Sequence, residues 1–120
     1  MLVNPNTTRI YLCLGSTDMR KGFDGLFALV SDRMQLDPLT GHLFAFCNRD
    51  RTRIKVLYWD GSGLWICAKR LEKGCFAWPE NHVEGKSPEI PCLSAAQWTL
   101  LVEGIDLRQT KERRWLRIKK

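Results

Sequence analysis

The feature that most restricts the fold is a run of short β-rich segments between residues 42 and 78, each ended by polar or glycine turn residues. The segments are His42–Cys47, Thr52–Trp59, Leu64–Lys69 and Cys75–Trp78. The tetrapeptide Asp60–Gly63 between the second and third is typical of a tight hairpin, because glycine supplies the positive φ that such turns require. Together these segments predict an antiparallel meander.

An apolar stripe predicts a helix before the meander. Its residues recur at steps of three and four, which places them on one helical face: Met19, Phe23, Leu26, Phe27, Val30 and Met34. Ser16, Thr17 and Asp18 offer N-cap oxygens ahead of it. The segment Arg9–Leu14 is rich in β-formers and predicts a short first strand.

A second helix is predicted over Leu93–Ile105. Ser94 and Gln97 have capping-box spacing, Leu93 and Trp98 are placed as a hydrophobic staple, and Gly104 is a C-terminal stop. The predicted fold class is therefore α+β, with an antiparallel four- or five-stranded sheet and one or two helices packed on one face. In the strand Thr52–Trp59, we expect the face that holds Arg53 and Lys55 not to be buried.

The 120 residues fit one domain, and 44% hydrophobic residues suffice for a core. With no apolar run long enough to span a bilayer and no signal sequence, we expect a cytoplasmic protein without membrane contact. The five cysteines form no Cys-x-x-Cys pair, so we expect buried thiols.

Charge divides the chain into a single α+β domain over 1–107 and a basic C-terminal tail over 108–120. The tail holds seven of the 19 cationic residues and one of the 13 acidic residues, so the domain is formally neutral and the tail carries the whole net charge of +6. Such a tail attracts polyanions at long range. Within the domain, residues 49–73 are basic and residues 74–107 are acidic.

The cations fall into four groups that predict contacts to nucleic-acid phosphates. Arg20 and Lys21 lie in the first turn of the predicted helix, where a bound phosphate would suit the helix N-terminus, although Asp18 and Asp24 are alternative local partners. The other groups are Arg49, Arg51, Arg53 and Lys55 on the first hairpin; Lys69, Arg70 and Lys73 near the next turn; and Arg113, Arg114 and Arg117 in the tail. The alternative for the first hairpin group is a solvated hairpin that charge keeps soluble, and the alternative for the tail is a flexible chain end. Whether the second group adjoins the first depends on strand register.

Catalytic chemistry has little support in the sequence. Four aspartates, Asp18, Asp24, Asp32 and Asp60, are the candidates for a two-metal nuclease, which requires carboxylates that converge. Zinc binding by Cys47, Cys67, Cys75 and His42 is the weaker alternative, because strand thiols are ordinary core residues. We therefore expect no catalytic residues, no metal and no cofactor.

Four ordered blocks carry a resemblance to a known family. They read TDMRKGFDG (17–25), GHLF (41–44), RIKVLYWDG (53–61) and AKRLEKG (68–74), followed by Phe76 and Trp78. This pattern resembles TnpB, the second-frame protein of insertion sequences of family sixty-six, which shares only a name with RNA-guided TnpB nucleases. The resemblance implies an accessory protein of DNA transposition, encoded beside a separate transposase that carries the acidic catalytic triad, and it transfers no catalytic residue.

Two hypotheses follow for the function. The first is a non-catalytic module that binds transposon ends through the basic residues and recruits the element-encoded transposase. The second is a protein-interaction subunit without direct DNA contact, whose acidic stretch from Glu80 to Asp106 pairs with a basic partner or with the tail of a second copy in a homo-oligomer.

Overall fold

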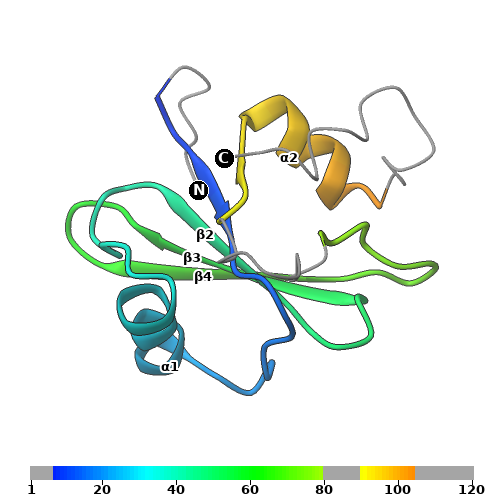
Figure 1. Cartoon of the computed structure of the whole chain (residues 1–120), viewed down its shortest axis with the longest axis horizontal. Coiled ribbons are helices and arrows are strands. Elements are labelled where there is room, and N and C mark those ends of the chain that lie inside the picture. The colour runs from blue at the N-terminus through cyan, green and yellow to red at the C-terminus, as the bar shows by residue number, and fades with distance from the viewer. Residues whose placement is uncertain (1–6, 80–89, 105–120) are drawn as a thin grey trace, which may run out of the picture.

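The computed structural model describes residues 7–79 and 90–104, and these form a single five-stranded sheet with two helices (Figure 1). The strands are β1 (Ile10–Leu12), β2 (Leu43–Cys47), β3 (Arg53–Trp59), β4 (Leu64–Arg70) and β5 (Cys92–Leu93), in the spatial order β4-β3-β2-β1-β5. The helices are α1 (Phe23–Ala28), which continues as the π-helical segment η1 (Leu29–Arg33), and α2 (Ala95–Val102). The predicted α+β class is confirmed.

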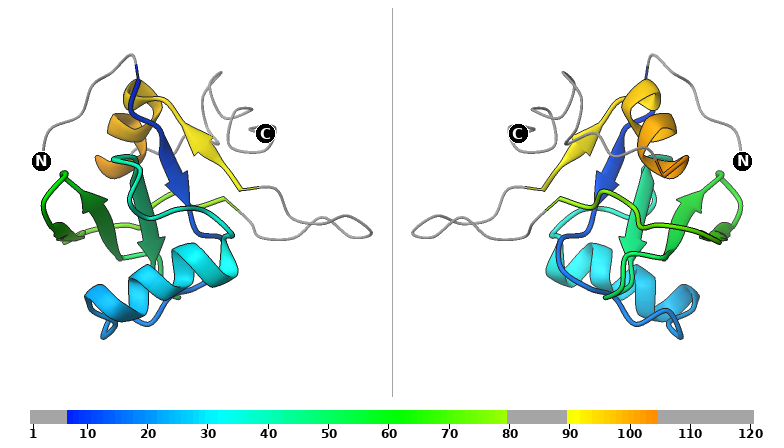
Figure 2. Two further views of the ribbon diagram at one scale, coloured as in Figure 1. Left: turned by 90° about the vertical axis from the view of Figure 1, so that its left-hand side faces the viewer. Right: turned by 90° about the vertical axis from the view of Figure 1, so that its right-hand side faces the viewer.

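The two helices cover opposite faces of the sheet, as the two side views show (Figure 2). Phe44 and Phe46 of β2 face Leu26 and Val30 of the first helix, whereas the alternate β2 residues pack with Leu101 of α2. The prediction that both helices lie on one face is wrong in this detail. The burial of β2 reflects this arrangement: all five of its residues are buried, because each face of the sheet is covered by a helix.

The predicted helical stripe is confirmed in its central part, since Leu26, Val30 and Met34 are all buried beneath the sheet. The start is later than predicted: Gly22 is the N-cap, without a side-chain cap. The last turn widens, so that the Met34 N–H bonds the Leu29 carbonyl 2.9 Å away.

Strand pairing departs from a simple meander at β1, which pairs parallel to β2 and antiparallel to β5. The hairpin at residues 60–63 is confirmed, because β3 and β4 pair from Arg53↔Arg70 to Trp59↔Leu64 around it. The predicted strand over 75–78 does not form. The segment after β4 instead packs into the core, where the buried Trp78 donates from Nε1 to the Cys13 carbonyl at 3.1 Å.

The cation-bearing face of β3 lies on the α1 side of the sheet, contrary to our expectation that it is not buried. Leu57, on this face, is completely buried with the α1 core, whereas Arg53 is exposed and Lys55 is half-buried. The face is thus apolar under the helix and cationic where it extends beyond it.

The second helix is capped as predicted. The Ser94 hydroxyl accepts the Gln97 N–H at 3.2 Å, and the Gln97 side chain accepts the Ser94 N–H at 2.9 Å. Gly104 follows the helix with a φ of +81°. The helix begins at Ala95, because Leu93 belongs to β5, where it pairs with Ile10.

The cysteines are not uniformly buried as predicted. Cys13 and Cys47 are buried, and burial raises the pKa of the Cys47 thiol to about 11. Cys67 and Cys92 are half-buried, and Cys75 is exposed. Within the described ranges, no helix has the length and apolar character that crossing a membrane requires.

Candidate nucleic-acid interface

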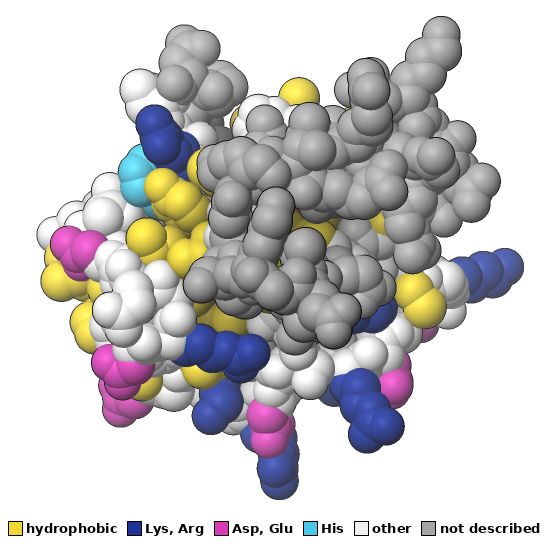
Figure 3. Space-filling model, viewed as in Figure 1, with side chains coloured by type: hydrophobic (Ala, Val, Ile, Leu, Met, Phe, Trp, Pro, Cys, Tyr) yellow, Lys and Arg dark blue, Asp and Glu magenta, His cyan; other side chains and the backbone are white. Residues whose placement is uncertain are grey.

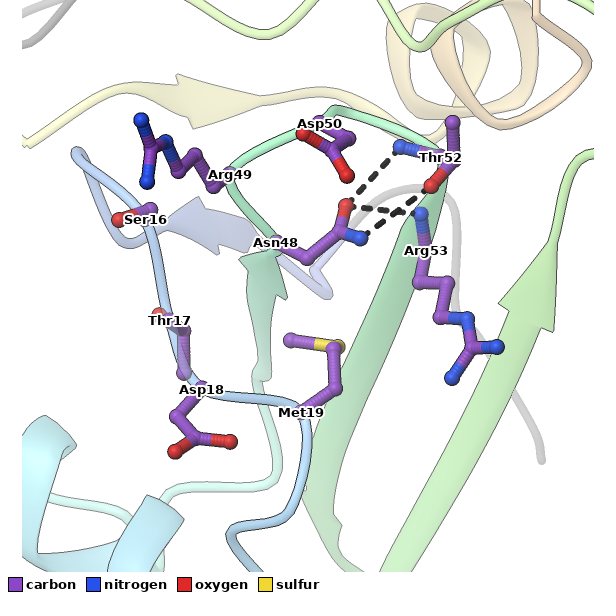
Figure 4. Close-up of a pocket in the computed structure, with 9 residues that line it drawn as sticks. All are labelled: Ser16, Thr17, Asp18, Met19, Asn48, Arg49, Asp50, Thr52 and Arg53. Atoms are coloured by element: carbon purple, nitrogen blue, oxygen red, sulfur yellow. Dashed lines mark hydrogen bonds between the residues drawn. The ribbon is translucent and has the colours of Figure 1, made fainter.

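An open hollow lies where β2 ends and the chain turns toward β3 (Figure 4). Its volume is about 860 Å³, and its walls come from the segment after β1 and from the β2–β3 loop. The lining residues are Ser16, Thr17, Asp18, Met19, Asn48, Arg49, Asp50, Thr52 and Arg53. The two walls are joined at the base, where the Thr17 N–H bonds the Cys47 carbonyl at 2.8 Å.

Asn48 shapes the loop side of the hollow. Its Oδ1 accepts the backbone N–H groups of Thr52 at 2.9 Å and Arg53 at 3.0 Å, while its Nδ2 donates to the Thr52 hydroxyl at 3.2 Å. An asparagine that satisfies the N–H groups of its own turn is a common loop device. It holds the backbone so that Arg49 and Arg53 lie on opposite sides of the hollow (Figure 4).

Strand pairing adds cations to the same side of the sheet. Arg53 lies directly opposite Arg70 of β4, and Lys55, two residues along β3, projects from the same face. Like charges directly opposite each other on a sheet are destabilising. Arg70 is partly compensated by Glu72, whose Oε2 lies 3.3 Å from the guanidinium, whereas Arg53 has no ion-pair partner within residues 7–79 and 90–104.

Lys21 joins this surface through Lys55, whose Nζ donates to the Lys21 carbonyl at 2.9 Å. Both side chains lack an ion-pair partner within the described part of the chain. Lys21 and Arg20 precede Gly22, the N-cap, so the prediction that they lie in the first helical turn is wrong.

Arg20 is engaged locally, as the alternative interpretation proposed. Its Nη2 lies 2.7 Å from Asp18 Oδ2, and its Nε donates to both carboxylate oxygens. The hydrogen bonds from the Arg20 side chain and backbone hold the pKa of Asp18 well below its ordinary value. Since the guanidinium is largely exposed, it remains accessible to a second anion.

Two predicted contact residues serve the fold instead. Arg51, with a φ of +62°, donates from Nη1 to the Gly15 carbonyl at 2.9 Å and so fastens the β2–β3 loop to the end of β1. Lys69 projects from the α2 face of β4 and donates to the Val102 carbonyl at 2.8 Å, at the C-terminus of α2. Lysine at that position also suits the negative end of the helix dipole.

The remaining predicted cation within the described residues, Lys73, is not part of the hollow. Lys73 is exposed in the turn after β4. Arg113, Arg114 and Arg117 lie outside the described residues, as do four of the five acidic residues in the stretch from Glu80 to Asp106, namely Glu80, Glu84, Glu89 and Asp106. In the space-filling view, cationic side chains project along the lower edge of the molecule, interspersed with acidic ones (Figure 3).

Two of the side chains considered for metal binding, Asp60 and His42, are engaged in hydrogen bonds within the fold. Both oxygens of Asp60 are occupied, as Oδ1 accepts the Ser62 and Gly63 N–H groups and Oδ2 accepts Trp65 Nε1 at 2.7 Å. His42 accepts the Arg9 N–H at Nδ1. Within the described ranges, no three His, Cys, Asp or Glu side chains form a group that can hold a metal ion.

Sequence reasoning predicted the arginines of the hollow but gave no role to Asn48 and Thr52 in its polar lining. Asn48 and Thr52 had a readable signal, because asparagine at the start of a cation-rich loop is typical of a side-chain-stabilised turn. Ser16 was recognised as a polar residue ahead of the helix, but its proximity to the loop, like that of Met19, follows from the pairing of β1 with β2 and has no local signal.

The fold and its cationic end define a small α+β protein with an open polar surface suited to anionic ligands. The profile of the IS66 Orf2-like family, the TnpB proteins of IS66 insertion sequences, matches residues 8–112. The chain belongs to this family of transposition accessory proteins, which confirms the resemblance of the four sequence blocks.

Two relatives come from Sinorhizobium fredii, and both bear the description of an uncharacterized protein. The protein y4hO is 39% identical over 112 residues, which cover 93% of each chain. The protein y4jC is 35% identical over 107 residues, which cover 88% of this chain and 86% of that one. No solved structure matches the chain.

Proposed function

We propose that this protein is a non-catalytic accessory factor that binds transposon-end DNA through the cationic end of its sheet and brings the element-encoded transposase to it. Family membership supports the role in transposition. The surface consists of the hollow and the cations around it: Arg20, Lys21, Arg49, Arg53, Lys55 and Arg70.

The observation that carries the proposal is the set of cations without an acidic partner in the described structure. Lys21, Arg49, Arg53 and Lys55 come from two separate segments of the chain, and none has an ion-pair partner within residues 7–79 and 90–104. Arg53 also lies opposite Arg70. Gathering like charges is unfavourable in isolation, and a phosphate backbone relieves that repulsion while matching the fork of each guanidinium.

The shape of the surface suits backbone contacts. The hollow is open, and Ser16, Asn48 and Thr52 supply hydroxyl and amide groups between its two arginines. Such contacts position a protein on nucleic acid without reading the sequence. The basic tail, with seven cations between Arg108 and Lys120, adds long-range attraction that speeds association.

The non-catalytic part of the proposal rests on where the candidate carboxylates are engaged. Asp18 is ion-paired with Arg20, and Asp60 holds a hairpin turn together with Trp65. A two-metal nuclease needs carboxylates that share a cation. We therefore assign strand cleavage to the separate transposase and DNA binding to this chain.

The test is DNA binding across a salt series, with terminal-repeat and scrambled duplexes, for the full chain and for a chain ending at Leu107. Neutralising Z phosphates makes log affinity fall with log salt at a slope near −0.9Z. We expect a steep slope for the full chain and a shallower one after truncation. Preference for the repeat would show specific readout in addition to backbone contact.

The hollow itself is tested by the double change Arg49→Ala and Arg53→Ala. We expect the magnitude of the salt slope to fall by about two, because each phosphate contact contributes about one. The matched control is Arg9→Ala, which removes a cation at the opposite end of β1 and β2. Undiminished binding by the double variant would overturn the assignment, and no binding by any chain at low salt would favour the protein-interaction subunit.

A further inference from the structure

One edge of the sheet is formed by β4, a seven-residue strand that has a partner strand on one side only among the described residues. β5, at the other edge, has two residues, whereas β4 has seven and pairs only with β3 among the described strands. The backbone bonds of Asp60 with Gly63 and of Thr52 with Leu71 fix the phase of the β3–β4 ladder. Since bonds in an antiparallel ladder alternate, the residues whose N–H and C=O groups point outward are Leu64, Ile66, Ala68 and Arg70.

These outward groups have no backbone hydrogen-bond partner within residues 7–79 and 90–104. A free edge of this length is a template for another strand, and proteins that stay monomeric usually shorten, cover, interrupt or charge it. The charges of β4 lie at one end only, at Lys69 and Arg70. No proline or glycine interrupts Leu64–Arg70. The edge also carries Trp65, whose exposed fraction of 53% is the largest among the large hydrophobic side chains described.

The charges along β4 select the orientation of a partner strand. Beside its first residues lies Asp60, whose pKa is lowered to about 2 by the hydrogen bond from Trp65 and those from its own turn, so it is anionic at neutral pH. The other end carries Lys69 and Arg70, with Lys73 after them. Parallel pairing of two such strands puts cations against cations, whereas antiparallel pairing puts the cationic end of each against the Asp60 end of the other.

We propose that β4 pairs with β4 of a second copy of this chain, antiparallel and centred on Cys67, so that the two sheets become continuous. In this register Leu64 faces Arg70 of the second copy and Ile66 faces Ala68, and all of these residues have outward-pointing backbone groups. Trp65 then lies across from Lys69 of the second copy, and the face of an indole ring is a favourable neighbour for a cation. Two-fold symmetry makes the interface self-complementary.

The register has a chemical consequence at its centre. Cys67 of each copy occupies a pair without backbone hydrogen bonds, because its own N–H points toward β3. Cα atoms in such a pair are about 4.5 Å apart, within the range that a disulfide spans. An added two-electron oxidant such as diamide therefore takes two electrons from the facing Cys67 thiols, which lose two protons and join as a disulfide, while Cys75 lies outside the paired strand.

The first measurement is the mass of the full chain in solution by light scattering, with reductant present. We expect twice the 13.9 kDa of one chain. Mild oxidation should then give a covalent dimer that the Cys67→Ser variant loses and the matched Cys75→Ser variant keeps. A monomeric mass together with no Cys67-dependent crosslink overturns the proposal.

A proline on the edge separates pairing from folding. The Ala68 N–H points outward, so Ala68→Pro removes a donor that β3 does not use, at a type of position where edge strands tolerate proline. We expect this variant to keep its far-UV circular dichroism and to halve in mass, while Ala68→Val, which keeps the N–H, stays dimeric. A folded Ala68→Pro variant that remains dimeric contradicts this interface, and if the variant does not fold, the Cys67 crosslink decides.

Discussion

The two hairpin tips of this sheet use the same local device and have opposite electrical character. At the β2–β3 tip the Asn48 Oδ1 accepts the N–H groups of Thr52 and Arg53, and at the β3–β4 tip the Asp60 Oδ1 accepts those of Ser62 and Gly63. A neutral acceptor leaves the first tip cationic, whereas a charged acceptor makes the second anionic. The choice between amide and carboxylate therefore sets the charge of each end without changing the turn chemistry.

The tips also differ in how firmly they are attached to the rest of the molecule. At the first tip, the Thr52 carbonyl accepts the Leu71 N–H at 2.8 Å and the Arg51 carbonyl accepts the Phe76 N–H at 2.7 Å. At the second, the contacts found within the described residues are local, with Trp65 Nε1 bonded to Asp60. The first tip is thus part of the framework, and the second is an exposed turn.

The largest effect is expected from Asn48→Ala. It leaves two backbone N–H groups without their acceptor in a half-buried loop, which costs about 1–3 kcal/mol of unfolding free energy. Urea denaturation measures this loss. Asn48→Asp is the control, because it keeps an acceptor at the same place, and equal losses in the two variants would show that the Oδ1 acceptor does not hold the loop.

A smaller effect is expected from acid at the second tip. The hydrogen bond from Trp65 and those from the turn lower the pKa of Asp60 from 3.8 to about 2. Because the carboxylate is favoured in the folded state, its contribution is complete above the unfolded pKa and is lost as the pH falls from about 4 through 2. Thermal melts between pH 5 and 2 should therefore fall less steeply for Asp60→Asn than for the unchanged chain, and parallel slopes would contradict this.

A change at Trp65 tests how much its hydrogen bond to Asp60 lowers the pKa of that carboxyl. Trp65→Phe keeps an aromatic ring on the exposed edge but removes the Nε1 donor to Asp60, so the pKa of Asp60 should rise toward its ordinary value. Nuclear magnetic resonance titration of the Asp60 carboxyl measures the shift. An unchanged pKa would assign the lowering to the turn N–H groups alone.

The features that sequence reasoning predicted correctly are those whose cause lies within a few residues. The Ser94–Gln97 capping box and the Asp60–Gly63 turn are local, and the stripe of Leu26, Val30 and Met34 is a property of helix geometry. The two-residue strand β5 was missed because it exists only through its pairing with Ile10 and Tyr11. No local pattern encodes such a pairing.

The candidate site divides in the same way. Residue type and clustering indicated Arg49 and Arg53, and the structure places both around one hollow. Arg51 and Lys69 have the same residue chemistry, yet they bond carbonyls 36 and 33 residues away in the chain, at Gly15 and Val102. Which cations face solvent and which hold the fold together is decided by contacts that only the folded chain brings about.

The smallest expected effect tests whether the charge of a tip, rather than its shape, governs DNA binding. Asn48→Asp places a carboxylate between Arg49 and Arg53 while keeping the turn acceptor, so affinity for DNA should fall by up to about 1 kcal/mol, the size of a surface charge pair. Asp60→Asn removes a charge of the same size at the other tip and should leave affinity at moderate salt unchanged. The seven residues of β3 separate the two tips by about 20 Å, which exceeds the screening length of about 10 Å. Fluorescence anisotropy on a terminal-repeat duplex measures both. Affinity changes of equal size and opposite sign in the two variants would mean that net charge alone drives binding, because one variant adds a negative charge and the other removes one. A loss confined to Asn48→Asp would locate the interface at the first tip.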